Sequence, residues 1–102
     1  MYYQGTIRAI REAIREKHPS MEALFVDLSR LDEPHVPFAY LLWMCDEIEK
    51  MDITSIDQAI KAGRWIGWIS AHVESKGLWK NDKTRDLVRE DKENGFDKPR
   101  QK

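Results

Sequence analysis

Residues 55–76, S-I-D-Q-A-I-K-A-G-R-W-I-G-W-I-S-A-H-V-E-S-K, decide the fold. Nothing in this stretch ends a helix before Gly77, and Thr54 followed by Asp57 three residues later is typical of a helix start. Gly77 fits the position just after a helix, with Leu78 as its hydrophobic follower. The stretch therefore predicts one helix of about 21 residues, the longest in the chain.

Apolar and small residues cover an arc of roughly 240° on this helix. The arc contains Ile56, Ala59, Ile60, Ala62, Gly63, Ile66, Gly67, Ile69, Ser70, Ala71 and Val73, with Trp65 at its edge. An arc that wide needs neighbours on two sides, so we expect residues 55–76 to form the central helix of a bundle or a helix shared with a second subunit. Gly63 and Gly67 each cost on the order of 1 kcal/mol of helix propensity relative to alanine. We favour close approach of another backbone as the reason, with close approach of a ligand as the alternative.

The opposite sector of the same helix is polar apart from one indole ring. It contains Lys61, Arg64, Trp68, His72 and Ser75. The ring could stack on a base or on a partner's aromatic side chain while the basic residues contact a phosphate or a carboxylate. Alternatively, the last helix or the N-terminal segment folds over this sector and covers the ring.

A helix over residues 37–51 is predicted from an apolar face that contains Phe38, Leu41, Leu42, Cys45 and Ile48. Trp43 projects away from that face, so it has the same two interpretations as Trp68. Glu49 falls within the apolar face and needs a cationic partner, for which Arg64 and the arginines of the first helix are candidates.

Three further helices complete the expected fold. The first covers residues 3–17, with isoleucines at a helical spacing, and ends at His18-Pro19 because proline disfavours helical geometry before it. The second is capped by Ser20 and runs to residue 31, and a linker with two prolines follows over residues 32–37. The last is capped by Asn81 or Asp82 and ends at Asn94-Gly95. We therefore expect an all-α bundle of four to five helices, with a single domain over residues 1–95 and a flexible polar tail over residues 96–102.

Composition narrows the class of protein. The chain has 102 residues, of which 41% are hydrophobic and 34% are charged, as in soluble globular domains. Its net charge of −1 gives no overall indication of nucleic-acid binding. Cys45 is the only cysteine, so no internal disulfide or zinc ribbon can form. No apolar secretory signal is present at the N-terminus, and we expect a cytoplasmic protein that does not associate with a membrane.

The sequence contains no complete catalytic or metal-binding motif. The densest carboxylate group contains Asp46, Glu47, Glu49 and Asp52. Acid-rich helices can hold magnesium in nucleotide pyrophosphohydrolases, but Lys50 interrupts this group and the paired motif is missing, so a metal-dependent nucleotide hydrolase ranks third among our hypotheses. The three histidines lack the spacing of a zinc site. We predict no catalytic residue, no metal and no cofactor.

An arginine stripe on the first helix is the best candidate for phosphate contacts. Arg8, Arg11 and Arg15 recur at helical spacing. Arg8 and Glu12 are also spaced to form an ion pair on the helix surface, so the arginines could instead be ordinary surface residues.

The segment Lys61 to Ile69, K-A-G-R-W-I-G-W-I, is followed by Gly77 and then by the charged residues 85–91. This arrangement resembles small helical proteins of tailed bacteriophages and prophages, in which a K-A-x-R-W-[IL]-G-[WF] helix precedes a glycine stop and an R-E-x-N/D-R-like segment. The resemblance covers about residues 40–91, and Ser70-Ala71-His72 departs from the glutamine-glycine that often follows the aromatic residue. It implies a phage-derived, intracellular context in bacteria and no assigned activity.

These features predict a small non-catalytic protein that acts by binding another protein, such as a host factor or a defence component. The expected binding face contains Lys61, Arg64, Trp68, His72 and Trp43. The alternative is a nucleic-acid or nucleotide-binding accessory protein that uses Arg64, Trp68 and the first-helix arginines. We also expect a homodimer through residues 37–51 and 55–76, with Gly63, Gly67 and Trp65 at the contact.

Overall fold

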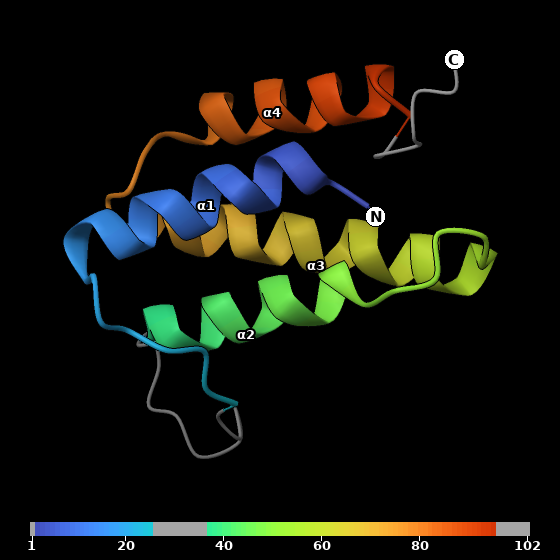
Figure 1. Ribbon diagram of the computed structural model, residues 1–102. Coiled ribbons are helices and arrows are strands. Elements are labelled where there is room, and N and C mark those ends of the chain that lie inside the picture. Colours follow the sequence, from blue (N-terminus) through green and yellow to red (C-terminus); the bar gives the residue numbers. More distant parts are fainter. Residues whose placement is uncertain (1, 26–36, 96–102) are drawn as a thin grey trace.

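The computed structural model describes residues 2–25 and 37–95, and within these ranges the chain is helical with no strand (Figure 1). The helices are α1 (Gln4–Lys17), α2 (Phe38–Glu49), α3 (Ile56–Ser75) and α4 (Asn81–Glu93). Each packs mainly on two neighbours, because α1 and α3 both contact α2 and α4. The all-α prediction is confirmed. The two-sided packing does not set α3 apart as the centre of the bundle.

The core lies inside this closed ring of helices and is built by α1, α2 and α3. Its fully buried large side chains come from the apolar faces predicted for these helices and include Ile7, Ile10, Ile14, Leu41, Leu42, Ile48, Ile69 and Val73. Each contributes roughly 1.5–3 kcal/mol through burial. The buried side chains of α4 are instead polar, namely Thr84 and Asp91. Because its buried side chains are polar, α4 needs specific hydrogen bonds to pack against the other helices.

The ends of α3 follow from its sequence. The predicted start at Thr54 is one residue too early: Ser55 is the N-cap, and its hydroxyl accepts a hydrogen bond from the Gln58 N–H at 3.3 Å, whereas the Thr54 hydroxyl donates to Asp52. At the other end Gly77 has φ +79°, which glycine adopts without strain. The Gly77 N–H donates to Glu74 O and the Leu78 N–H donates to Val73 O, both at 3.0 Å, so the helix closes in a Schellman motif.

The start of α4 differs from the expected cap. The N-cap is Lys80, which makes no side-chain capping bond, and Asn81 is already the first helical residue. The side chain of Asn81 instead accepts a hydrogen bond from the Ser70 hydroxyl of α3. Prediction of the helix is confirmed, but prediction of an asparagine or aspartate cap is wrong because Asn81 serves the contact between helices.

The helix predicted from Ser20 to residue 31 is wrong over its described part. Residues 21–25 are not helical, and the Leu24 N–H donates to Ala39 O in the first turn of α2 at 3.0 Å. The Phe25 ring packs on Tyr40 and Trp43, with centroid distances of 6.2 and 4.9 Å. These contacts with α2 replace the expected helical turn. The remainder of that helix, most of the linker over residues 32–37 and the tail over residues 96–102 lie outside the described residues.

The carboxylate of Asp91 caps α1 from another helix. The backbone N–H groups of Gly5 and Thr6 each donate to it at 2.8 Å, and the Thr6 hydroxyl donates at 2.6 Å. The N-cap residue of α1, Tyr3, has φ 56° and makes no side-chain capping bond. Asp91 therefore satisfies N–H groups that have no partner within the helix, and its negative charge lies at the positive end of the α1 dipole.

Gly5 leaves the space that this carboxylate occupies. A Cβ atom at Gly5 would lie 2.7 Å from Asp91 Oδ1, whereas a Cβ atom at Gly67 of α3 would have no atom within 4 Å. Gly5→Ala should therefore displace Asp91 and lower the free energy of unfolding by about 1–3 kcal/mol. Gly67→Ala should raise it by about 0.5–1 kcal/mol through helix propensity. Urea denaturation measures both, and shifts of the same sign would contradict this assignment.

Cys45 has no exposed surface, and burial raises the pKa of its thiol to about 12. The folded chain keeps a proton that the unfolded chain loses above its ordinary pKa of 9.0, so this contribution to stability is complete below pH 9 and is lost as pH rises toward 12. Wild type should lose about 1 kcal/mol more than Cys45→Ala between pH 7 and pH 10. Urea denaturation across that range tests the prediction, and parallel curves for the two proteins would contradict it.

Candidate functional site

Aromatic side chains line the seam between α2 and α3. Tyr40 and Trp43 lie one turn apart on α2, with stacked rings whose centroids are 5.4 Å apart. On α3, Trp65 and Trp68 have the same spacing. The Trp68 ring meets the edge of Tyr40 at 5.8 Å, and Trp65 lies 6.0 Å from Trp43. Each pair shares one face of its helix, and the two faces oppose one another.

A cleft of about 300 Å³ opens in this seam. Its lining residues are Tyr40, Met44, Arg64, Trp65 and Trp68. Arg64 is exposed, and the described residues that line the cleft include no carboxylate. Lys61, one turn before Trp65, holds its Nζ atom 4.9 Å from the centroid of a Trp65 ring. The site therefore combines aromatic walls with cationic charge at its rim.

The structure brings the predicted binding-face residues into one region. Trp68 is half-buried and its ring centroid lies 4.0 Å from that of His72, while Arg64 lines the cleft beside Trp68. The Tyr40 ring of α2 packs edge to face against the Trp68 ring. Trp43 is half-buried against Tyr40 and Phe25.

Sequence reasoning missed Tyr40 and Met44 as cleft residues. Both are buried, and they lie on α2 opposite the aromatic residues of α3. The available signal was the shared spacing of three residues between Tyr40 and Trp43 and between Trp65 and Trp68. That spacing predicts an aromatic face on each helix, but only the packing of the two helices shows that the faces meet.

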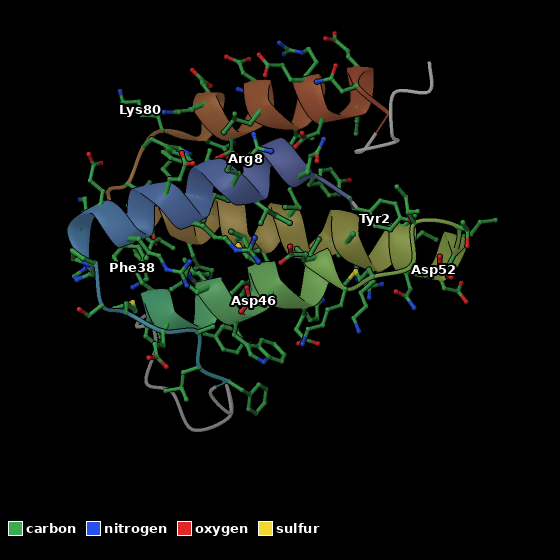
Figure 2. The ribbon with its side chains drawn as sticks, in the orientation of Figure 1. Tyr2, Arg8, Phe38, Asp46, Asp52 and Lys80 are labelled. Atoms are coloured by element: carbon green, nitrogen blue, oxygen red, sulfur yellow. The ribbon has the colours of Figure 1, made fainter. Side chains whose placement is uncertain are left out.

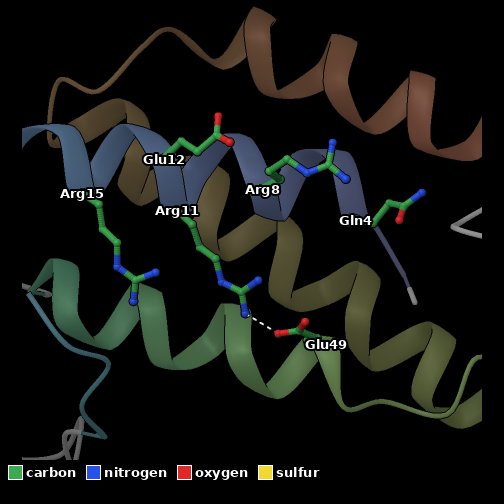
Figure 3. A pocket seen from close by; sticks show the side chains of 6 residues that line it. All are labelled: Gln4, Arg8, Arg11, Glu12, Arg15 and Glu49. Atoms are coloured by element: carbon green, nitrogen blue, oxygen red, sulfur yellow. Dashed lines mark hydrogen bonds and ion pairs between the residues drawn. The ribbon is translucent and has the colours of Figure 1, made fainter. Parts of the chain in front are cut away.

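A second hollow, of about 480 Å³, lies beside α1 (Figure 3). It contains the predicted arginine stripe and is lined by Gln4, Arg8, Arg11, Glu12, Arg15 and Glu49. In Figure 3 the guanidinium groups of Arg11 and Arg15 point toward α2, whereas Glu12 points toward α4. Figure 2 shows Arg8 on α1 and Asp46 on α2 from a wider view.

Arg11 is the partner of the α2 carboxylates. Its Nη2 atom lies 2.6 Å from Asp46 Oδ1 and 2.5 Å from Glu49 Oε1. Burial disfavours the charged form of Arg11, but hydrogen bonds to Glu49 and Asp46 outweigh burial and raise its pKa. A first-helix arginine is therefore the cationic partner that Glu49 was expected to need. Arg8 and Arg15 are exposed and form no ion pair with another described residue.

The other residues of the predicted carboxylate group, one in α2 and one in the loop after it, also have partners. Glu47 pairs with Lys50 at 3.3 Å. Asp52 accepts hydrogen bonds from the Thr54 hydroxyl and N–H at 2.7 and 2.9 Å, which lower its pKa. Among the residues that the structure describes, no three His, Cys, Asp or Glu side chains lie close enough together to hold a metal ion.

The predicted self-association residues fall on two different surfaces. The missing Cβ of Gly63 faces the Tyr3 hydroxyl at 3.5 Å, and that of Gly67 faces open space. In the described part of the chain, therefore, no other backbone uses the glycine notch. Both glycines line a hollow of about 400 Å³ with residues of α4, whereas Trp65 lines the aromatic cleft.

Part of the apolar arc of α3 is exposed. Ile56 and Ile60 retain 78% and 56% of their accessible surface, so the expectation that the whole arc is buried within the bundle is wrong at this end of the helix, whereas the alternative of a helix shared with a second subunit stays a prediction. The first turns of α3 extend past the ends of α2 and α4 (Figure 1), so neither neighbour covers this end of the helix.

None of the described helices is long and apolar enough to cross a bilayer. Comparison with models of protein families, with curated proteins and with solved structures found no match to this chain. The side chains of the aromatic cleft and of the α1 hollow are therefore the basis for inferring function.

Proposed function

We propose that this chain is a non-catalytic binding protein whose aromatic cleft between α2 and α3 receives a side chain of a protein partner. The observation that supports the proposal is the meeting of Trp65, Trp68 and Tyr40 with Arg64 around one cleft. Tryptophan, tyrosine and arginine are the residues most enriched among those that dominate binding energy at protein interfaces. Aromatic rings provide a large contact area at low entropic cost, and Arg64 adds directional hydrogen bonds.

Partial exposure of the rings supports binding over a purely structural role. Trp65 and Trp68 are half-buried, although each has enough apolar surface to be a core residue. The rings already pack on Tyr40 and Trp43, so they are held in place before a partner arrives. A partner would cover prearranged apolar surface and lose little affinity to ordering of the site.

A nucleic-acid-binding role is the second candidate, because Arg8 and Arg15 remain unpaired among the described residues. They flank Arg11 in the hollow beside α1. Phosphate groups could occupy this hollow while bases stack elsewhere. Two acidic side chains, Glu12 and Glu49, line the same hollow and weaken this alternative.

The resemblance of residues 61–69 to proteins of tailed phages supports a phage-derived origin. In that setting the protein would act in the cytoplasm of a bacterial host, and its partner would be a host factor or a defence component. Both statements belong to the proposal.

A pull-down tests protein binding. Wild type and variants are immobilised and exposed to bacterial lysate with and without nuclease. We expect Arg64→Glu to lose the retained proteins, because it reverses the charge at the cleft, and Arg89→Glu on α4 to keep them. Nuclease should not change the result. Retention of the same proteins by Arg64→Glu would contradict the proposal.

A separate titration with a 20-nucleotide single strand tests the second candidate. Binding that weakens steeply with salt and is lost in Arg8→Ala/Arg15→Ala would favour nucleic-acid binding, because phosphate contacts release counterions. Under our proposal the strand binds no more tightly to wild type than to that variant.

Self-association remains part of the proposal, now through one face of α3. Ile56, Ile60, Gly63 and Gly67 fall within a sector of about 60°. Two exposed isoleucines beside two glycines give an apolar surface that a second copy could cross closely. This face is distinct from the aromatic cleft, so a dimer would leave the cleft open.

The substitution Gly67→Leu distinguishes an effect on dimer formation from an effect on folding of the monomer. A Cβ atom at this position would have no atom of the described chain within 4 Å, so the variant should fold about as stably as wild type. We expect wild type to sediment at twice 12.1 kDa and Gly67→Leu to sediment at 12.1 kDa. Wild type that remains at 12.1 kDa at micromolar concentration would contradict self-association.

A further inference from the structure

We propose that the aromatic cleft selects an acidic–aromatic segment of its partner, in which an apolar ring enters the cleft and an adjacent carboxylate binds Arg64. This inference rests on the proposed function and names the chemistry of the partner.

The apolar part of the ligand follows from the cleft walls. Tyr40 and Trp68 meet edge to face at 5.8 Å, and the buried Met44 lies beside them with a soft, polarisable side chain. A volume of about 300 Å³ is at the lower end for ligand pockets and suits one side chain better than a large organic molecule. The walls favour a ring, because a ring can add a further edge-to-face contact with either indole.

The charge of the ligand follows from the rim. Arg64 lines the cleft, is exposed and forms no ion pair with a described residue. Lys61 lies over the Trp65 ring but lines the neighbouring hollow, so Arg64 is the charged residue among the described residues that line the cleft. The described lining includes no carboxylate, so nothing there compensates a cationic ligand. Carboxylates fit the planar guanidinium with two parallel hydrogen bonds.

The neighbouring surface favours a single carboxylate over a phosphate chain. Trp65 also borders a smaller hollow of about 210 Å³, which is lined by Glu47, Lys50, Met51, Gln58 and Lys61. A nucleic-acid strand that followed the seam past Trp65 would meet Glu47 and Lys50, which already pair with each other, and only Lys61 would remain in this hollow for its phosphates. A short peptide segment can instead place a polar side chain there, next to Gln58.

Four tryptophans provide a direct readout, because each indole N–H gives one signal in a proton–nitrogen correlation spectrum. Each signal is assigned by its loss in a Trp→Phe variant. The probes are 3-phenylpropionate, its neutral amide and 3-phenylpropylamine, which share a ring and differ in charge. We expect the Trp65 and Trp68 signals to shift. The Trp79 signal should stay, because its N–H donates to the Thr84 hydroxyl at 2.7 Å, away from the cleft.

Affinity should fall in the order acid, amide, amine, with the acid about fivefold tighter than the amide, as expected for one exposed ion pair. Arg64→Gln should remove the advantage of the acid and preserve binding of the amide. Arg89→Gln, a matched change on α4, should leave the order unchanged.

Equal affinity of acid and amide, or tighter binding of the amine, would overturn the inference and leave the proposed function intact if lysate proteins are still retained through Arg64. A thymidine dinucleotide that shifts the same two signals more tightly than the acid would overturn it in favour of nucleic acid. Absence of any shift at Trp65 and Trp68, together with no retained protein, would overturn both proposals.

Discussion

The attachment of α4 to the rest of the bundle depends on one carboxylate, that of Asp91, which caps the N-terminus of α1. Asp91 accepts three hydrogen bonds from Gly5 and Thr6, and it is 4% exposed. The rest of α4 is largely polar, so apolar burial alone would hold it weakly. The Asp91 contact joins α4 to α1 and closes the ring of four helices. Because Gly5 has no side chain, the carboxylate can approach the backbone of α1 closely.

The seam between α2 and α3 differs in kind from the hydrogen-bonded contact between α1 and α4. That seam is aromatic, half-exposed and bordered by Arg64 and Lys61. Its rings pack on one another, so the walls of the cleft are already in place without a partner. The hydrogen bonds that attach α4 to α1 and the rim of the aromatic cleft thus lie on opposite sides of the bundle, which is a division of roles between two seams. This arrangement allows residues at the rim of the cleft to change without loss of the fold.

The four described helices could be predicted from sequence because their signals are local, such as the isoleucine spacing in α1 and the Gly77 stop after α3, although the sequence pattern places the cap of α3 one residue too early, at Thr54. Arg64 and Trp68 could be identified because an indole on a basic helix face is unusual in sequence. Other features depend on how helices meet. From sequence alone, Met44 is indistinguishable from an ordinary core residue, because its place in the cleft depends on α3 lying opposite it. Asp91 is likewise indistinguishable from the other charged residues of its helix. The exposure of Ile60 depends on where the neighbouring helices end, which periodicity does not show.

The most direct test of this division measures the free energy of unfolding of three variants by urea denaturation. Asp91→Ala leaves two backbone N–H groups and a buried hydroxyl without their acceptor, and it should cost about 2 kcal/mol or more. Asp86→Ala on the same helix removes an exposed partner of Arg89 and should cost no more than about 0.5 kcal/mol, as should Arg64→Ala at the cleft. If Arg64→Ala costs as much as Asp91→Ala, the cleft is part of what holds the fold together and the division is wrong.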